Sequence, residues 1–211
     1  MNKVLLKEQA YDELKALILA GEFASGSFLS ERALADRLGM SKTPIRTALE
    51  RLEQERFISI SPQQGVVVRE LTLQEIRDHY DIRVALECFV VKRLVNRLTD
   101  AQLEALDANL ETMRRQIESG NDTYAMYADA DFHLLLGNFY GNHEISRVMQ
   151  HQREKLYRVV TKLHENHPHR TRESLAEHLA IVEALKVGDG DLAADNMLAH
   201  LNNGRRLLIE L

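Results

Sequence analysis

Apolar residues recur every three to four positions along most of the chain, which is the period of an amphipathic helix. Between residues 5 and 20, Ala10, Leu14, Leu17 and Ile18 fall on one face, and Gly21 follows them as a stop signal. We therefore expect the chain to begin with a helix over residues 5–20.

A second helical pattern starts at Ser30, whose hydroxyl suits an N-cap, and Gly39 can close that helix in the left-handed conformation. After a short turn, Ser41 or Thr43 can cap another helix, and Pro44 fits its first turn. Two helices joined by a short turn containing Gly predict a helix-turn-helix.

Two β-rich runs follow, at residues 57–60 and 66–69, and residues 61–65 (SPQQG) supply the turn between them. The Phe28-Leu29 pair upstream can form a further small strand. A helix-turn-helix followed by a hairpin predicts a winged helix, in which the second helix of the motif enters the DNA major groove.

Lys42 and Arg46 lie one turn apart near the start of that second helix, so they face the same way and can reach bases or phosphates together. Arg32 is placed to contact the DNA backbone, and Gly65 allows the wing to approach a groove closely. The competing interpretation is a solvated helical hairpin with ordinary surface cations. The ordered combination of upstream helix, Gly turn, Pro start and hairpin favours DNA binding.

The segment LSERALADRLGMSKTPIRTALERLEQERFI resembles the signature of the GntR family of bacterial winged-helix transcription regulators. The resemblance implies base and phosphate contacts at Arg32, Lys42, Arg46 and Gly65. Many members carry Arg where this chain has Lys42, and Lys lacks the fork with which Arg binds guanine. The predicted DNA-binding residues are Arg32, Ser41, Lys42, Thr43, Arg46 and Gly65.

From residue 71 onward the pattern is helical, and Thr72 with Glu75 and Thr99 with Gln102 form capping-box signatures. The predicted fold class is mainly α, with a winged helix-turn-helix domain over residues 1–70 and an all-α six-helix bundle over residues 71–211. The expected helices of the bundle span about residues 72–97, 99–118, 122–140, 143–164, 172–187 and 190–210.

The composition excludes several classes of protein. No apolar run is long enough to span a bilayer, and the N-terminus lacks the apolar centre of a signal peptide. A single cysteine, Cys88, excludes an internal disulfide framework and fits a reducing compartment. We therefore expect a cytoplasmic protein.

The formal net charge of −5 is unevenly distributed. Residues 1–69 hold ten Lys and Arg against nine Asp and Glu, whereas residues 70–211 hold 17 against 23. The acidic excess therefore lies outside the predicted DNA-binding domain. Because that domain is not strongly basic, its affinity for DNA should depend on a few well-placed cations and on dimerisation.

Three histidines of the second half, His133, His178 and His200, lie on the apolar faces of their predicted helices. Asp129 precedes His133 by one turn on the same face. Three imidazoles and a carboxylate from three helices can meet in a bundle core and bind a divalent metal. Such a donor set suits Zn, Ni, Mn or Fe, and geometry alone does not choose among them; we take zinc as the first candidate. The competing interpretation makes each histidine a hydrogen-bonded core residue.

Segments 128–133 (ADADFH), 174–178 (SLAEH) and 197–201 (MLAHL) resemble the metal motifs of the FCD effector domain, found in the FadR-type branch of the GntR family. The resemblance implies that the quartet binds a metal, which a small carboxylate effector then coordinates. Asn142 matches a position that FCD proteins often hold as Asn, and we assign it to the effector pocket. Arg83 can clamp an effector carboxylate; alternatively it pairs with Glu87, four residues later.

Together these features predict a ligand-responsive transcription regulator that binds a palindromic operator as a homodimer and responds to a small carboxylate. The alternative function is a metal-dependent hydrolase or lyase with an N-terminal adaptor domain, because such a metal can activate water. No general base is evident beside the quartet, since Glu177 adjoins His178 and should point to another face. We therefore expect a regulator and no enzymatic activity.

Overall fold

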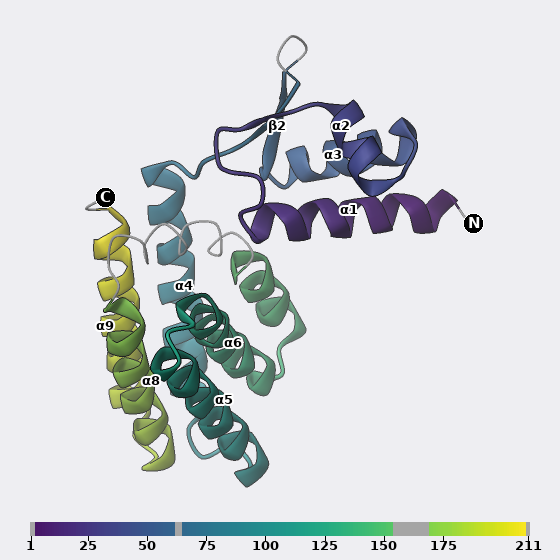
Figure 1. Ribbon diagram of the computed structural model, residues 1–211. Coiled ribbons are helices and arrows are strands. Elements are labelled where there is room, and N and C mark those ends of the chain that lie inside the picture. Colours follow the sequence, from purple (N-terminus) through teal and green to yellow (C-terminus); the bar gives the residue numbers. More distant parts are fainter. Residues whose placement is uncertain (1–2, 62–64, 154–168, 210–211) are drawn as a thin grey trace. The chain divides into compact units, whose positions relative to one another are not determined.

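The computed structural model describes residues 3–61, 65–153 and 169–209 (Figure 1). The chain divides into two compact units, Met1–Leu71 and Thr72–Leu211. The first is a small α/β unit and the second is entirely helical over its described residues, so the predicted mainly α fold class is confirmed.

The N-terminal unit is a winged helix-turn-helix. Its three strands are antiparallel in the order β1-β3-β2, and Ser59 of β2 pairs with Val67 of β3. Its elements are α1 (Lys3–Leu19), β1 (Phe28–Leu29), α2 (Glu31–Leu38), α3 (Lys42–Gln54), β2 (Ile58–Ser61) and β3 (Gly65–Val68). The middle of the turn between β2 and β3, residues 62–64, lies outside the described residues.

Local chemistry sets the ends of α2, as the sequence predicted. The Ser30 hydroxyl accepts a hydrogen bond from the backbone N–H of Ala33 at 3.1 Å, and Gly39 ends the helix at φ 63°. Helix α3 packs on α1 through the fully buried Ile45, Leu49 and Leu52. This packing fixes α3 on the core of its own unit and leaves its opposite face exposed.

The C-terminal unit contains six helices within its described residues. Capping boxes at Thr72 and Thr99 start the first two, as expected. The helices are α4 (Leu73–Leu94), α5 (Asp100–Glu118), α6 (Asp122–Tyr140), a helix described over residues 143–153, α8 (Arg170–Lys186) and α9 (Gly190–Ile209). The remainder of the helix predicted over residues 143–164 falls outside the described residues.

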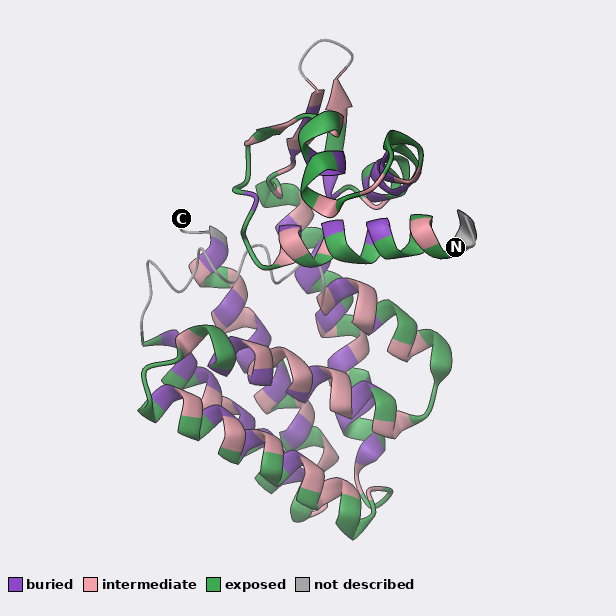
Figure 2. Ribbon diagram, turned by 45° about the vertical axis from the view of Figure 1, so that its right-hand side comes forward, coloured by how far each residue is buried: buried purple, intermediate pink, exposed green. Residues whose placement is uncertain are grey.

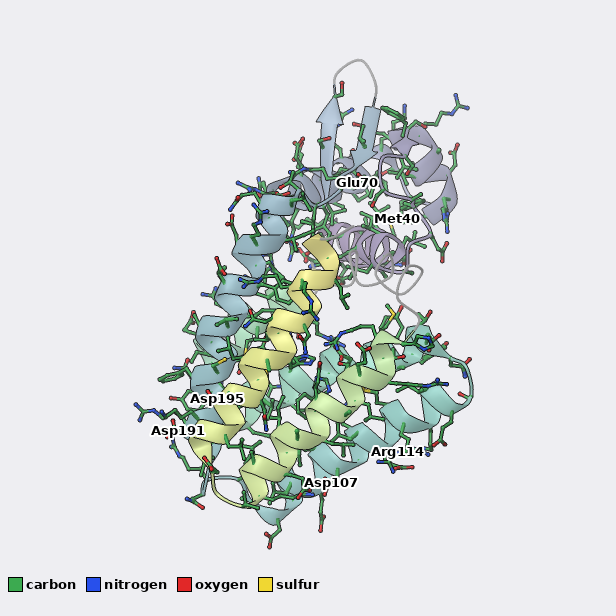
Figure 3. The ribbon with its side chains drawn as sticks, turned by 90° about the vertical axis from the view of Figure 1, so that its left-hand side faces the viewer. Met40, Glu70, Asp107, Arg114, Asp191 and Asp195 are labelled. Atoms are coloured by element: carbon green, nitrogen blue, oxygen red, sulfur yellow. The ribbon has the colours of Figure 1, made fainter. Side chains whose placement is uncertain are left out.

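Helix α9 packs against α4 and α8, while α6 contacts α4, α5 and α8. Buried and exposed positions alternate with every turn along these helices (Figure 2), so each presents one face to the core. The acidic residues Asp191 and Asp195 extend outward from α9 (Figure 3). Throughout the part of the chain that the structure describes, no helix has both the length and the apolar character needed to cross a bilayer.

Candidate metal centre and nucleic-acid interface

The three inward histidines and Asp129 meet in the core of the C-terminal unit. Asp129 and His133 lie one turn apart on α6, His178 lies on α8, and His200 lies on α9. The three histidines are 6%, 0% and 4% exposed, respectively. One potential ligand atom from each of the four residues lies within 4.8 Å of all the others, so the structure brings the whole predicted quartet together.

The imidazoles converge through their Nε2 atoms. The Nε2 atom of His200 lies 3.1 Å from that of His133 and 3.3 Å from that of His178. Two nitrogens bound to one tetrahedral zinc at the usual bond length are about 3.3 Å apart. The carboxylate oxygens of Asp129 lie 4.0 Å from Nε2 of His133 and 3.7 Å from Nε2 of His178. The nitrogen spacing therefore fits a single small cation.

A buried carboxylate on α4 orients His133. Oε2 of Glu87 lies 2.6 Å from Nδ1 of His133, and Oε1 of Glu87 accepts a 2.6 Å hydrogen bond from Nε of Arg83. Burial alone raises the pKa of the Glu87 carboxyl, but the charge of Arg83 and the contact with His133 together bring it below its ordinary value. Glu87 is therefore ionised, and it fixes both the ring and the tautomer of His133.

A second carboxylate does the same for His200. Oε2 of Glu177 lies 2.7 Å from Nδ1 of His200 and accepts a 2.7 Å bond from Nη2 of Arg170, while Oε1 accepts from Asn203 at 2.7 Å. Burial raises the pKa of Glu177, but bonds from His200 and Arg170 lower it to about 2 overall. The core thus contains two chains of the same kind, Arg–Glu–His, both ending at the Nε2 cluster.

These contacts decide which nitrogen carries hydrogen. A carboxylate only accepts, so Nδ1 of His133 and Nδ1 of His200 each bear hydrogen and their Nε2 atoms present lone pairs. Two lone pairs facing each other at 3.1 Å repel unless a cation or a proton lies between them. The donor set is therefore suited to a divalent metal, and zinc is one that three imidazoles and a carboxylate can bind.

His178 and Asp129 complete the donor set in different ways. The ring of Phe132 stacks on His178 at 4.0 Å between centroids and holds its plane. Burial lowers the pKa of His178 and of His200, which keeps both imidazoles neutral, as metal ligands must be. Burial opposes ionisation of Asp129, but the three imidazoles and a hydrogen bond from Ser174 outweigh it and lower its pKa.

A cavity of about 70 Å³ adjoins the quartet and is lined by residues of α4, α6, α8, α9 and the helix at 143–153. Asp129, His133 and His200 form part of its wall, and Arg83 lies on the α4 side. Both interpretations of Arg83 therefore stay compatible with the structure: it pairs with Glu87, and it faces the cavity.

Asn142 requires a correction. It is exposed, and it is absent from the described residues that line the cavity. Its Oδ1 accepts hydrogen bonds from the backbone N–H groups of Glu144 and Ile145 at 3.0 and 3.2 Å. Asn142 is thus the N-cap of the helix at residues 143–153, a role that Asn before a helical run favours.

Glu177 also departs from expectation. It does point away from His178, but that direction leads to α9, where it contacts His200. Sequence reasoning missed Glu87 and Arg170 as partners of the site as well. The pair Arg83–Glu87 was visible as an i,i+4 spacing, whereas the contact from Glu87 to His133 joins residues on different helices and leaves no local signal.

The predicted DNA-binding side chains of α3 lie on its exposed face. Ser41, Lys42, Thr43 and Arg46 are all exposed, and Ser41 occupies the N-cap position in extended conformation. Arg46 is not a free cation, because its Nη2 lies 3.0 Å from Oε2 of Glu31 at the start of α2.

The two remaining predicted DNA contacts also have partners or constraints inside the unit. Arg32 on α2 is highly exposed and lies 3.8 Å from Asp36. Gly65 adopts φ +85°, and a Cβ there would meet the carbonyl oxygen of Leu29 at 2.9 Å. Glycine at the start of β3 is therefore required by the pairing of β1 with β3, whether or not the wing contacts DNA.

Comparisons with known proteins agree with this architecture. Residues 6–68 match the family described as bacterial regulatory proteins, gntR family, and residues 78–203 match the FCD domain. The uncharacterized HTH-type transcriptional regulator YdhC of Bacillus subtilis is 30% identical over 92% of this chain and 87% of its own length. The HTH-type transcriptional repressor RspR of Escherichia coli is 29% identical, over 93% and 86%. The structure of E. coli McbR/YncC superposes with a TM-score of 0.83 at 25% identity and covers 97% of each chain.

Proposed function

The chain belongs to the GntR family of bacterial regulatory proteins and carries an FCD domain, and from this premise we propose that it is an operator-binding regulator controlled by a divalent metal and a small organic acid. Its family and its relatives are DNA-binding transcription regulators, not enzymes. The metal, the acid, the individual contact residues and the dimer are the parts that this proposal adds.

In the proposed complex α3 is the recognition helix, and Lys42 and Arg46 contact bases or phosphates from its first two turns. Both side chains are exposed on one face of a helix whose other face is fixed in the core. Because Glu31 pairs with Arg46, a phosphate must compete with that carboxylate. Exposed ion pairs contribute little to stability, so replacing Glu31 by a phosphate costs little free energy.

The metal half of the proposal depends on one observation: three Nε2 atoms and an Asp129 oxygen converge to within 4.8 Å, and two of the imidazoles face the cluster with lone pairs. Asp129, His133, His178 and His200 would hold the ion. A metal bound there supplies a Lewis-acidic point of attachment for a carboxylate. Arg83 and Arg170 line the same cavity, and each helps to orient one of the proposed ligands through its Glu.

A route to the DNA-binding unit is available through α4. This helix carries Arg83 and Glu87, and only four residues separate its first residue, Leu73, from the last residue of β3. An effector that binds one position of α4 better than another shifts the equilibrium between the two positions. In a two-fold dimer, such a shift changes the spacing of the recognition helices and hence operator affinity.

The homodimer is supported by an apolar stripe on α4. Ile82, Ala85 and Phe89 share one face of the helix at helical spacing, and all three are exposed in the single chain. Exposed apolar side chains grouped in this way are typical of interaction surfaces. A dimer through α4 would place the helix that carries Arg83 and Glu87 at the interface.

The test combines metal analysis with DNA binding. Protein purified without chelators should contain about one divalent metal per chain by elemental analysis, and His178→Ala should lose most of it while far-UV circular dichroism is unchanged. Zinc at 100 times its dissociation constant should stabilise the C-terminal unit by about 2.7 kcal/mol, and adding a chelator should remove that stabilisation. Metal-free protein that gains no stability from any divalent ion would refute the metal site and leave the regulator intact.

Operator binding is tested separately by the double variant Lys42→Ala plus Arg46→Ala. It should lose most of its affinity for a promoter fragment in a gel-shift assay, whereas His178→Ala should retain DNA binding and lose the response to organic acids. Normal DNA binding by the double variant would show that α3 is not the recognition helix.

A further inference from the structure

The cavity beside the quartet has a polar wall that the proposed metal ligands do not use. Arg170 and Thr171 in the first turn of α8, and Gln152 in the helix at 143–153, all line the cavity and are 6%, 2% and 8% exposed. Nη1 of Arg170, Oγ1 of Thr171 and Oε1 of Gln152 are buried and make no hydrogen bond to any described residue. Buried polar atoms are rarely left unpaired, so this wall is suited to the polar end of a ligand.

The two terminal nitrogens of Arg170 have different surroundings. Its Nη2 donates to Glu177 at 2.7 Å and thereby supports His200. Its Nη1 has no such bond, because the Glu173 oxygen lies 3.7 Å away, beyond hydrogen-bonding distance. Nη2 of the guanidinium is therefore bound to the protein, whereas Nη1 can still donate a hydrogen bond to a ligand.

The charges around the cavity limit what that ligand can be. Arg83, Arg153 and Arg170 each pair with a carboxylate, from Glu87, Asp131 and Glu177 respectively. With neutral imidazoles, Asp129 offsets one of the two charges of a divalent metal, so a single positive charge remains. One carboxylate balances that charge, whereas a second anionic group would be buried without compensation.

The donors and acceptors of the wall then indicate the other end of the ligand. Arg170 can only donate, and Oε1 of Gln152 can only accept. A hydroxyl group does both, and Thr171 can add a further bond in either direction. A second carboxylate group on the ligand has no hydrogen that it could donate to Oε1 of Gln152. The wall therefore matches a neutral hydroxyl better than a second acid group.

We propose that the effector is a small hydroxylated monocarboxylate, with its carboxylate toward the metal quartet and a distal hydroxyl held by Arg170, Thr171 and Gln152. This inference depends on the proposed function of the quartet. The cavity of about 70 Å³ has room for on the order of five to seven water-sized groups. A four-carbon hydroxy acid has that size.

The experiment is titration calorimetry of the full-length, zinc-loaded protein with three matched acids: butyrate, 4-hydroxybutyrate and succinate. We expect 4-hydroxybutyrate to bind on the order of tenfold more tightly than butyrate, because it satisfies buried partners that butyrate leaves unpaired. Succinate should bind more weakly than 4-hydroxybutyrate. Equal affinity for butyrate and 4-hydroxybutyrate, or tightest binding of succinate, would overturn this inference alone. No binding of any acid would instead refute the proposed response to carboxylates.

Two variants test whether the wall residues cause the preference for 4-hydroxybutyrate over butyrate. Arg170→Lys retains a cation for Glu177 but loses the second nitrogen, and Gln152→Leu removes the acceptor without touching Glu177. Each should bring the affinity of 4-hydroxybutyrate close to that of butyrate. Gln152→Leu should do so with the bound zinc at wild-type level by elemental analysis. Arg170 also supports His200 through Glu177, so the affinities of Arg170→Lys are compared at a measured, saturating zinc content. Arg172→Lys, an exposed change on the same helix, is the matched control and should leave the preference intact. If Gln152→Leu with full zinc content keeps the tenfold preference, the proposed wall is wrong.

Discussion

Arginine–glutamate pairs occur in both units of the molecule, but in opposite surroundings. In the N-terminal unit, Arg46 and Glu31 pair with side chains that are 63% and 30% exposed. In the C-terminal unit, Arg83 and Glu87 pair with side chains that are only 9% and 4% exposed. Water therefore surrounds much of the first pair, whereas protein surrounds most of the second.

The difference separates two uses of one chemical pair. A surface ion pair is screened and is easily exchanged, so Arg46 can leave Glu31 for a phosphate. In the core each partner depends on the other, because a lone buried charge is expensive. The Glu87 carboxylate therefore stays in place and keeps His133 oriented. The exposed pair permits exchange with a ligand, and the buried pair maintains geometry.

The largest effect predicted from this comparison is that of Glu87→Ala. The substitution leaves the Arg83 charge buried without its partner, and it should lower the free energy of unfolding of the metal-free C-terminal unit by about 3–5 kcal/mol. Urea unfolding, followed by hydrogen exchange of amides in α4 and α6, measures the loss.

The matched control for that measurement is Glu144→Ala, which breaks an exposed Arg–Glu pair with Arg147 in the same unit. It should change stability only slightly. If the two substitutions lower the free energy of unfolding by the same amount, burial does not distinguish the two pairs and the comparison fails.

An intermediate effect is expected at Glu55 in the N-terminal unit. Its carboxylate is partly buried and accepts bonds from Tyr11 at 2.6 Å, Lys15 at 3.2 Å and Arg51 at 3.2 Å. Burial raises the pKa of Glu55, but these bonds lower it below the ordinary 4.5 overall. Because the folded pKa is depressed, the stability that Glu55 contributes is present above about pH 4.5 and is lost as the pH falls further.

The variant Glu55→Gln should therefore be less stable than the wild type at pH 6, and its stability should fall less steeply below pH 4.5. Hydrogen exchange of amides in α1 and α3 at a series of pH values measures both quantities. Glu50→Gln removes an exposed carboxylate from α3 and should reproduce the wild-type slope. If stability falls equally steeply with decreasing pH in the Glu55 variant and in the wild type, the bonds from Tyr11, Lys15 and Arg51 do not stabilise this carboxylate.

The sequence predicted the parts of the molecule whose causes are local. The cap at Ser30, the left-handed Gly39 and the capping boxes at Thr72 and Thr99 act within four residues, so they are readable from the sequence. The quartet was also predictable, because a polar side chain on an apolar stripe must point inward. Asn142 had an equally local signal as an N-cap, which the resemblance to FCD domains obscured.

The supporting residues of the site were not predictable in the same way. Glu177 reaches His200 only because α8 lies beside α9, and Glu87 reaches His133 only because α4 lies beside α6. Arg170 and Thr171 were missed for a different reason, since α8 begins two residues earlier than the helical period indicated. Periodicity defines the face of a helix but not which other helix that face meets.

The smallest effect on stability, and the most informative for DNA binding, is that of Glu31→Gln. The pair with Arg46 is exposed, so the substitution should leave the unfolding transition of the N-terminal unit unchanged within error. Binding of a promoter fragment should become severalfold tighter at low salt, because Arg46 no longer exchanges a carboxylate for a phosphate and one negative charge is removed near the DNA. The gain should be smaller in the Arg46→Gln background, where only the removal of the negative charge still acts, and it should shrink as salt increases. Glu8→Gln, which breaks the exposed pair with Arg51, should leave DNA affinity unaltered. Weaker binding by Glu31→Gln would mean that this carboxylate holds Arg46 in its DNA-binding position, so that the exposed pair, like the buried one, maintains geometry.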